Sequence, residues 1–364
     1  MKKKSKFQLI QEKTQLTINN TNNNIEILGK NTNELYISLN TIQELFDNIR
    51  NIPSEQMFEY EKIKKIRLEW KKQVQKIEKD YNNAVVKDAS AGVVGTGVGV
   101  TVLTLGPTIA MGVATTFGVA STGTAISTLS GAAATNAALA WLGGGALATG
   151  GGGIAAGQFL LTLAGPVGWT IAGVSLVASG LFFWKTKSEK SRIENIFSVI
   201  GERDVKSYEL AIVELKERVS RIVDENEKLN EAIKKIKSFG TDYTQMKESE
   251  QYELGAYVNL MLASTQLLVN PIKGLLPKYS EKDFEEFSKK NDGLIIKNRN
   301  LIISFANFLY KIELDENDKK LLYRKLKLNK EVLKGINISK KDFSFDMFNM
   351  VFDALKEKYM SEGK

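Results

Sequence analysis

The clearest regular pattern in the chain is a repeat of mostly apolar residues between positions 208 and 236. The repeat alternates steps of four and three residues, which places its members on one side of an α-helix. Glutamate and lysine fill many of the positions between them, as is typical of a solvated helix exterior. The pattern predicts a coiled-coil helix, and its seam consists of Tyr208, Ile212, Leu215, Val219, Ile222, Asn226, Leu229, Ile233 and Ile236.

A similar spacing occurs upstream, where apolar residues recur at steps of three and four between residues 63 and 81. Pro53 predicts a break, so we expect one helix over residues 34–52 and a second over residues 54–83. Residues 1–30 include an Asn-rich run and show no clear apolar repeat, which favours a loop or a weak strand. We expect the upstream and downstream helices to pack as a long antiparallel bundle.

The C-terminal third also shows helical patterns, separated by Pro271 and Pro277. The apolar run over residues 302–308 is typical of a packing stripe. The expected helices cover residues 248–269, a segment that begins after Ser280, and residues 294–309, 318–335 and 342–360. The chain as a whole is therefore predicted to be all-α.

One long stretch departs from the composition of the rest. Residues 89–184 contain no Asp, Glu, Lys or Arg, although charged residues make up 25% of the chain. A soluble domain of this size would carry about two dozen charges. These 96 residues are therefore predicted either to be buried in protein on every side or to lie in lipid.

Length favours lipid, because a membrane-spanning helix needs about 20 mostly apolar residues. Residues 93–120 and 154–184 both meet this requirement. The stretch between them, residues 121–153, is rich in Ala, Gly, Ser and Thr and is only weakly hydrophobic. Two spans in a helical hairpin and four short spans both remain open.

The predicted organisation has four parts. They are an N-terminal helical arm over residues 1–88, an inserted Gly/Ala-rich hydrophobic membrane segment over residues 89–184, a coiled-coil arm over residues 185–245, and a C-terminal helical domain over residues 246–364.

Small residues dominate the uncharged segment, which holds 21 of the 29 glycines. In a bilayer, small residues spaced four apart let two helices approach closely. The predicted membrane helix contacts are Gly95, Gly99, Gly153, Gly157, Ala164 and Gly168. The alternative is that so many glycines produce these spacings by chance.

The downstream edge of the segment carries three aromatic residues followed by a lysine, which is typical of an anchor at the membrane interface. The predicted anchor consists of Phe182, Phe183, Trp184 and Lys185. The alternative is three aromatic residues in a helical core. Basic residues follow this edge and precede the other, which favours both termini in the cytoplasm and an inner or plasma membrane location. A soluble cytoplasmic precursor, in which the bundle shields the hairpin, is a further expectation.

Composition narrows the possible chemistry. The chain has no Cys and no His, which excludes disulfides, thiolate nucleophiles and zinc sites built from Cys and His. No paired carboxylates or nucleophile–base set occur at an interpretable spacing. The net charge of +8 is not concentrated in one region, so nucleic-acid binding is not expected. We therefore expect no enzymatic activity, no cofactor and no metal site.

Long amphipathic helices around one uncharged insertion resemble the layout of α-helical pore-forming toxins of the cytolysin A and tripartite haemolysin type. Residues 120–153 also resemble a Gly/Ala-rich module of assorted bacterial proteins, some with membrane or anti-phage effector associations. The resemblance implies an oligomeric bacterial effector or toxin that inserts into a lipid bilayer and permeabilises it, either the producing cell's own membrane or a foreign one. It implies as protein partners other copies of the chain or a helical protein. The alternative is a constitutive integral membrane scaffold or sensor with cytoplasmic coiled-coil domains.

Overall fold

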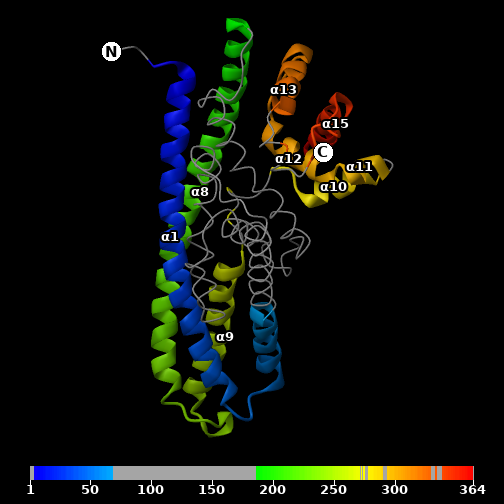
Figure 1. The fold of residues 1–364 in the computed structure, drawn as a ribbon. Helices are drawn as coiled ribbons and strands as arrows, with labels where there is room; N and C mark the ends of the chain where they lie inside the picture. The colour runs from blue at the N-terminus through cyan, green and yellow to red at the C-terminus, as the bar shows by residue number, and fades with distance from the viewer. Residues whose placement is uncertain are drawn as a thin grey trace, which may run out of the picture.

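The computed structural model describes residues 4–68, 186–270, 272, 274, 278–289, 293–328, 333 and 338–363. Within these ranges the chain is helical and contains no β-strand, which confirms the all-α prediction. Residues 54–68 are helical and carry no label in Figure 1. The labelled helices are α1 (Lys6–Asp47), α8 (Lys187–Ile236), the 3-10 helix η3 (Tyr243–Gln245), α9 (Glu248–Val269), α10 (Glu281–Ser288), α11 (Gly293–Lys297), α12 (Arg299–Leu309), α13 (Glu316–Leu328) and α15 (Phe345–Glu362).

The two longest helices, α1 and α8, lie side by side and run in the same direction (Figure 1). Lys6 Nζ lies 3.1 Å from Glu202 Oε1, and one heptad later Lys13 Nζ lies 3.0 Å from Glu209 Oε1. Because both numbers increase together, the pair is parallel. The predicted antiparallel arrangement is wrong for these two helices. An apolar repeat identifies the buried face of a helix but carries no information on the direction of its partner.

Residues 54–68 and α9 run antiparallel to this pair and complete a bundle of four helices around its C-terminal half (Figure 1). Tyr60 Oη donates a hydrogen bond to Asp47 Oδ1 at 2.7 Å, and Arg67 Nη1, seven residues later, donates to the Leu39 carbonyl at 3.0 Å. Because the residue numbers rise along one helix and fall along the other, residues 54–68 run antiparallel to α1. The two loops at this end of the bundle are tied together. The backbone N–H of Arg50 donates to the Thr241 carbonyl at 2.9 Å.

The predicted seam of α8 faces the core of this bundle. Leu215 and Leu229 are fully buried, and Tyr208 and Ile222 are nearly so. Val219 is half-buried and packs against the same core. The sequence pattern therefore identified the buried side of α8 correctly over its C-terminal half.

The prediction of a loop or weak strand over residues 1–30 is wrong, because α1 begins at Lys6. Ser5 caps its first turn, since the Gln8 backbone N–H donates to Ser5 Oγ at 3.2 Å and the Ser5 backbone N–H donates to Gln8 Oε1 at 2.9 Å. The buried face in this half carries Thr14, Thr17 and Thr21 in place of aliphatic residues.

The threonine hydroxyls are satisfied within α1 itself. Thr14, Thr17 and Thr21 each donate to the backbone carbonyl four residues earlier, at 2.8 Å. A hydroxyl bonded in this way can be buried without a partner on the facing helix. The threonines continue the three-and-four spacing of the buried face of α1. A search for apolar residues alone therefore does not detect the N-terminal half of this helix.

A second hydrophobic core forms where the first turns of α8 meet α10, α12, α13 and α15. Ile193, Ile200 and Phe197 are the buried residues of α8 in this core, together with Ile196. The stripe over residues 302–308 packs here, as predicted, with the Phe305 ring stacked on Phe343 at a centroid distance of 5.7 Å. The single helix expected over residues 294–309 is divided at Asn298 into α11 and α12.

Among the described residues, no helix combines the length and the apolar character that a transmembrane segment needs.

Two glycines next to the bundle give a matched test of the packing. A Cβ on Gly274 would lie 2.7 Å from the backbone nitrogen of Ala211, whereas a Cβ on Gly255 of α9 meets nothing closer than 3.6 Å. We predict that Gly274→Ala lowers the free energy of unfolding by about 1–3 kcal/mol through overpacking. Gly255→Ala should raise it by about 1 kcal/mol, because alanine favours the helix. Denaturant unfolding of both variants measures this, and equal effects of the two substitutions would contradict the packing.

Candidate functional site: the polar junction between α8 and the C-terminal helices

The residues predicted to act in the membrane lie outside the part of the chain that the structure describes. Their contacts therefore remain predictions. They are Gly95, Gly99, Gly153, Gly157, Ala164 and Gly168, with the interfacial anchor Phe182, Phe183, Trp184 and Lys185.

The described region next to these residues is the first turn of α8. Thr186 caps the helix, since its Oγ1 accepts a hydrogen bond from the Glu189 backbone N–H at 3.1 Å. Only Lys185 stands between this cap and the end of the uncharged stretch. The stretch therefore leads directly into the helix that contributes to both hydrophobic cores.

Ion pairs hold the start of α8 against α13. The Arg192 guanidinium lies 2.6 Å from Asp318 Oδ1 and 2.7 Å from Asp315 Oδ2. Hydrogen bonds to Asp318 and Asp315 raise the pKa of Arg192. One turn earlier, Glu189 accepts a hydrogen bond from the buried Lys325 ammonium at 3.0 Å. The first two turns of α8 are thus attached to α13 by charged groups on both helices.

A second attachment joins the first third of α8, at Arg203, to the end of α12. Arg203 Nη1 donates to the carbonyls of Phe308 and Tyr310, at 3.0 and 2.6 Å. The same guanidinium pairs with the neighbouring carboxylate of Asp204 at 2.9 Å, and both side chains are largely buried. Because the carbonyl end of a helix is electronegative, a buried guanidinium is favourable at this position.

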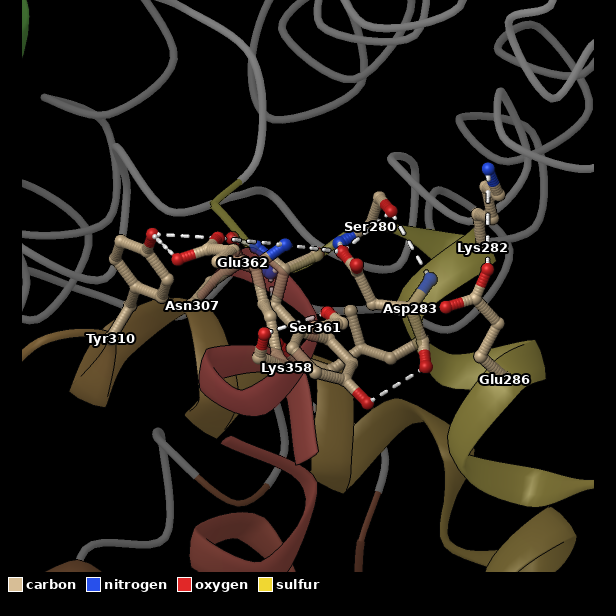
Figure 2. A network of polar contacts seen from close by, with 11 residues as sticks. Ser280, Lys282, Asp283, Glu286, Asn307, Tyr310, Lys358, Ser361 and Glu362 are labelled. Atoms are coloured by element: carbon tan, nitrogen blue, oxygen red, sulfur yellow. Dashed lines mark hydrogen bonds and ion pairs between the residues drawn. The ribbon is translucent and has the colours of Figure 1, made fainter. Parts of the chain in front are cut away.

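Polar contacts also connect α10, α12 and α15 behind this attachment, as Figure 2 shows. Lys358 of α15 donates to Asp283 Oδ2 of α10 at 2.7 Å, and the same oxygen accepts from Ser280 Oγ at 2.6 Å. Tyr310 Oη donates to Glu362 Oε1 at 2.9 Å. The Lys358 ammonium also lies 3.6 Å from Glu362 Oε1, so hydrogen bonds and this ion pair together connect the three helices.

An amide side chain reinforces the same junction from α12. Asn307 Oδ1 accepts from the Tyr279 backbone N–H at 2.9 Å, and Asn307 Nδ2 donates to the Tyr279 carbonyl at 2.8 Å. The side-chain amide of Asn307 thus pairs with both backbone polar groups of Tyr279, which holds the chain in place just before α10. Asn307 is buried, and with a further bond from Nδ2 to the Ile303 carbonyl at 2.9 Å its three bonds replace contacts with water.

Opposing effects set the protonation of this network. Burial alone would raise the pKa of Asp283, but hydrogen bonds from Lys358 and Ser280 and the lysine charge outweigh it, so the pKa is lowered. Burial and the hydrogen bond to the Glu362 carboxylate both raise the pKa of Tyr310 well above its ordinary value. At neutral pH the junction therefore holds an ionised Asp283 and a neutral Tyr310.

This geometry supports a mechanical role for the junction. Its charged groups are bonded to one another and to helix ends, which positions α8 against the C-terminal helices. Within the described ranges, no group of three or more Asp or Glu side chains could hold a metal ion. Sequence reasoning missed the junction because its contacts join residues far apart, such as Arg192 with Asp315 and Arg203 with Phe308.

Comparisons of the chain with protein-family models, with curated proteins and with solved structures found no match.

The pair of Asp283 and Lys358 gives a pH-dependent test of the junction. Because the pKa of Asp283 is lowered from 3.8, the pair contributes stability above that value and loses it as the pH falls through the lower pKa of the folded state. We predict that Asp283→Asn lowers the free energy of unfolding by about 1–3 kcal/mol at pH 7, since it removes the carboxylate 2.7 Å from the Lys358 ammonium and leaves only Glu362, at 3.6 Å. The difference from the wild type should shrink as the pH falls toward about 3.

The matched control is Glu285→Gln, which removes one exposed carboxylate from the same helix. We expect it to change the free energy of unfolding by less than about 0.5 kcal/mol. Urea unfolding followed at several pH values measures both variants. A loss for Asp283→Asn that is equally large at acidic and neutral pH would contradict the ionised pair.

Proposed function

We propose that this protein is a bacterial effector or toxin that inserts into a lipid bilayer and permeabilises it without catalysing a reaction. The observation that carries the proposal is the uncharged stretch over residues 89–184, between two flanks that hold all 92 charged residues of the chain. The proposed inserting element is a Gly/Ala-rich helical hairpin within this stretch.

The physical reason lies in the cost of charge in a bilayer. One Asp, Lys or Arg at the centre of a membrane helix costs about 2.5–3.5 kcal/mol on insertion scales. A segment that must enter lipid is therefore kept free of such residues, whereas a soluble domain gains solubility from them. The absence of charge from 96 consecutive residues fits the first requirement.

The described helices support the proposal as a frame for the inserting segment. α8 begins three positions after Trp184, and residues 54–68 lead toward the other end of the stretch. The ion pairs of Arg192 with Asp318 and of Glu189 with Lys325 attach the start of α8 to α13. A frame fixed in this way can stay folded while the segment changes its surroundings. In the proposal, α1 and α8 form the coiled-coil arm of that frame.

Within the membrane, the proposed helix contacts are the small residues at four-residue spacing, such as Gly95 with Gly99 and Gly153 with Gly157. Identical small-residue faces on several copies would pack together and give an oligomer. Phe182 to Trp184, followed by Lys185, would lie at the interface.

Basic residues on both flanks favour a location in the producing cell's own membrane with both termini in the cytoplasm. This orientation favours a defence effector that acts on its own cell over a secreted cytolysin.

Dye release from vesicles tests the proposal. The full chain is added to vesicles that contain anionic lipid and an entrapped dye, and it is compared with the double variant Val174→Glu, Leu176→Glu. We predict release by the native chain and at least a tenfold slower release by the variant, because two carboxylates in the segment oppose insertion.

The matched control is the double variant Ile296→Glu, Leu328→Glu. Both side chains are exposed aliphatic residues of the C-terminal helices, 62% and 64% accessible, so the same charges are added where they meet water. We expect this variant to release dye at the native rate. Equal release by the native chain and the Val174, Leu176 variant would contradict permeabilisation by this segment. Vesicle binding without any release would favour the constitutive membrane scaffold instead.

A further inference from the structure

A row of exposed aliphatic side chains follows one side of α1. Leu9, Leu16 and Ile37 are 53%, 69% and 55% exposed. The intervals between them are multiples of seven residues, so the three side chains lie on the same face of the helix. Water contacts this face even though α1 buries another face against α8.

α8 continues the same surface. The ion pair of Lys13 with Glu209 marks the edge along which the two helices meet on this side. Leu16 lies one turn after Lys13, and Val213 lies one turn after Glu209, so both flank the ion pair. Val213 is 63% exposed, and Val223, two heptads after Glu209, is 41% exposed. Exposed aliphatic side chains therefore lie on both helices at the outer surface of the pair, beside the ion pair.

We propose that this surface binds the same surface of a second copy of the chain, with the two copies antiparallel. The proposal uses only described residues and does not rest on the membrane activity. The exposed aliphatic residues of this outer surface are Leu9, Leu16, Ile27, Ile37, Val213 and Val223.

Charge complementarity argues for a second copy in this orientation. The exposed side chains on this side of α1 are basic near its start, at Lys6 and Lys13, and acidic near its end, at Glu34 and Glu44. An antiparallel copy brings Lys13 of one chain, which already pairs with Glu209 of α8, beside Glu34 of the other, so that the ammonium lies between two carboxylates. A parallel copy would instead place the Glu34 carboxylates of the two chains together, which disfavours that arrangement.

The apolar residues give the same register as the charges. In an antiparallel pair of identical helices, the residue numbers of two positions that face each other add up to the same total along the whole contact. The residue numbers of Leu9 and Ile37 and those of Lys13 and Glu34 add up to nearly the same total. The twofold axis lies at half of that total, near Asn23, so one axis allows both contacts. A twofold axis of this kind generates the isologous interface that is common in dimers.

The size of the surface is sufficient for a stable dimer. The distance from Leu9 to Ile37 along α1 is about 42 Å, and two helices side by side are about 20 Å wide. The buried area would be roughly 800 Å² per chain, which is the usual size of a specific interface. Rows of exposed aliphatic residues over such an area are uncommon on monomers.

Cross-linking tests the register directly, because the chain has no cysteine of its own. We expect the full chain with Asn23→Cys to form a disulfide-linked dimer under mild oxidation, since Asn23 is exposed and lies near the proposed axis. Leu9→Cys alone should not link, because its two copies would lie about 42 Å apart. Tyr252→Cys is the control for random collisions, with a position that is 82% exposed on α9.

Sedimentation of cysteine-free variants gives an independent readout. Leu16→Glu and Glu34→Lys should each raise the dimer dissociation constant at least tenfold, while Tyr252→Glu should leave it unchanged. Circular dichroism of each variant confirms that it is folded. A native chain that is monomeric at every concentration, or Leu9→Cys linking as fast as Asn23→Cys, would overturn the proposal.

Discussion

The structure depends on the continuity of α8, a single helix that contributes to two hydrophobic cores. Its first turns pack with the C-terminal helices, and the seam from Tyr208 onward packs with α1, α9 and residues 54–68. Arg203 and Asp204 lie between these two regions and attach the helix to the end of α12. Because a helix is stiff along its axis, both cores and the cap at Thr186 are held in one geometry.

The pairing of α1 with α8 divides into two chemically different halves. Toward the C-terminal end of α1 the contact is aliphatic, with Leu35, Leu39 and Ile42 fully buried. Toward the N-terminal end it is made by threonines whose hydroxyls are bonded within their own helix. Burial of a threonine in this way gains less from the hydrophobic effect than burial of a leucine, because less apolar area leaves water. The polar half is therefore the weaker part of the pair, and ion pairs such as Lys6 with Glu202 lie along it.

Sequence reasoning predicted the parts of the fold that depend on local spacing. The seam of α8, the bounds of α9, the cap at Ser280 and the stripe at residues 302–308 follow from the apolar period and from capping chemistry. The start of α1 was missed because threonine was not counted as a core residue. The parallel direction of α1 and α8 was missed because it depends on how distant segments meet. The same holds for the polar junction, where Arg203 reaches carbonyls more than a hundred positions away. The membrane contacts at Gly95 and Gly153 remain predictions.

The central claim is that the uncharged stretch enters lipid, and its own tryptophans report on it. Trp141, Trp169 and Trp184 lie within the stretch, so Trp70→Phe leaves all tryptophan emission there. The decisive measurement is the emission of this variant mixed with vesicles that carry a spin-labelled quencher in their acyl chains. We predict a blue shift and strong quenching of the tryptophan emission, both of which depend on the presence of the vesicles. Emission that stays unquenched with lipid in large excess would contradict it.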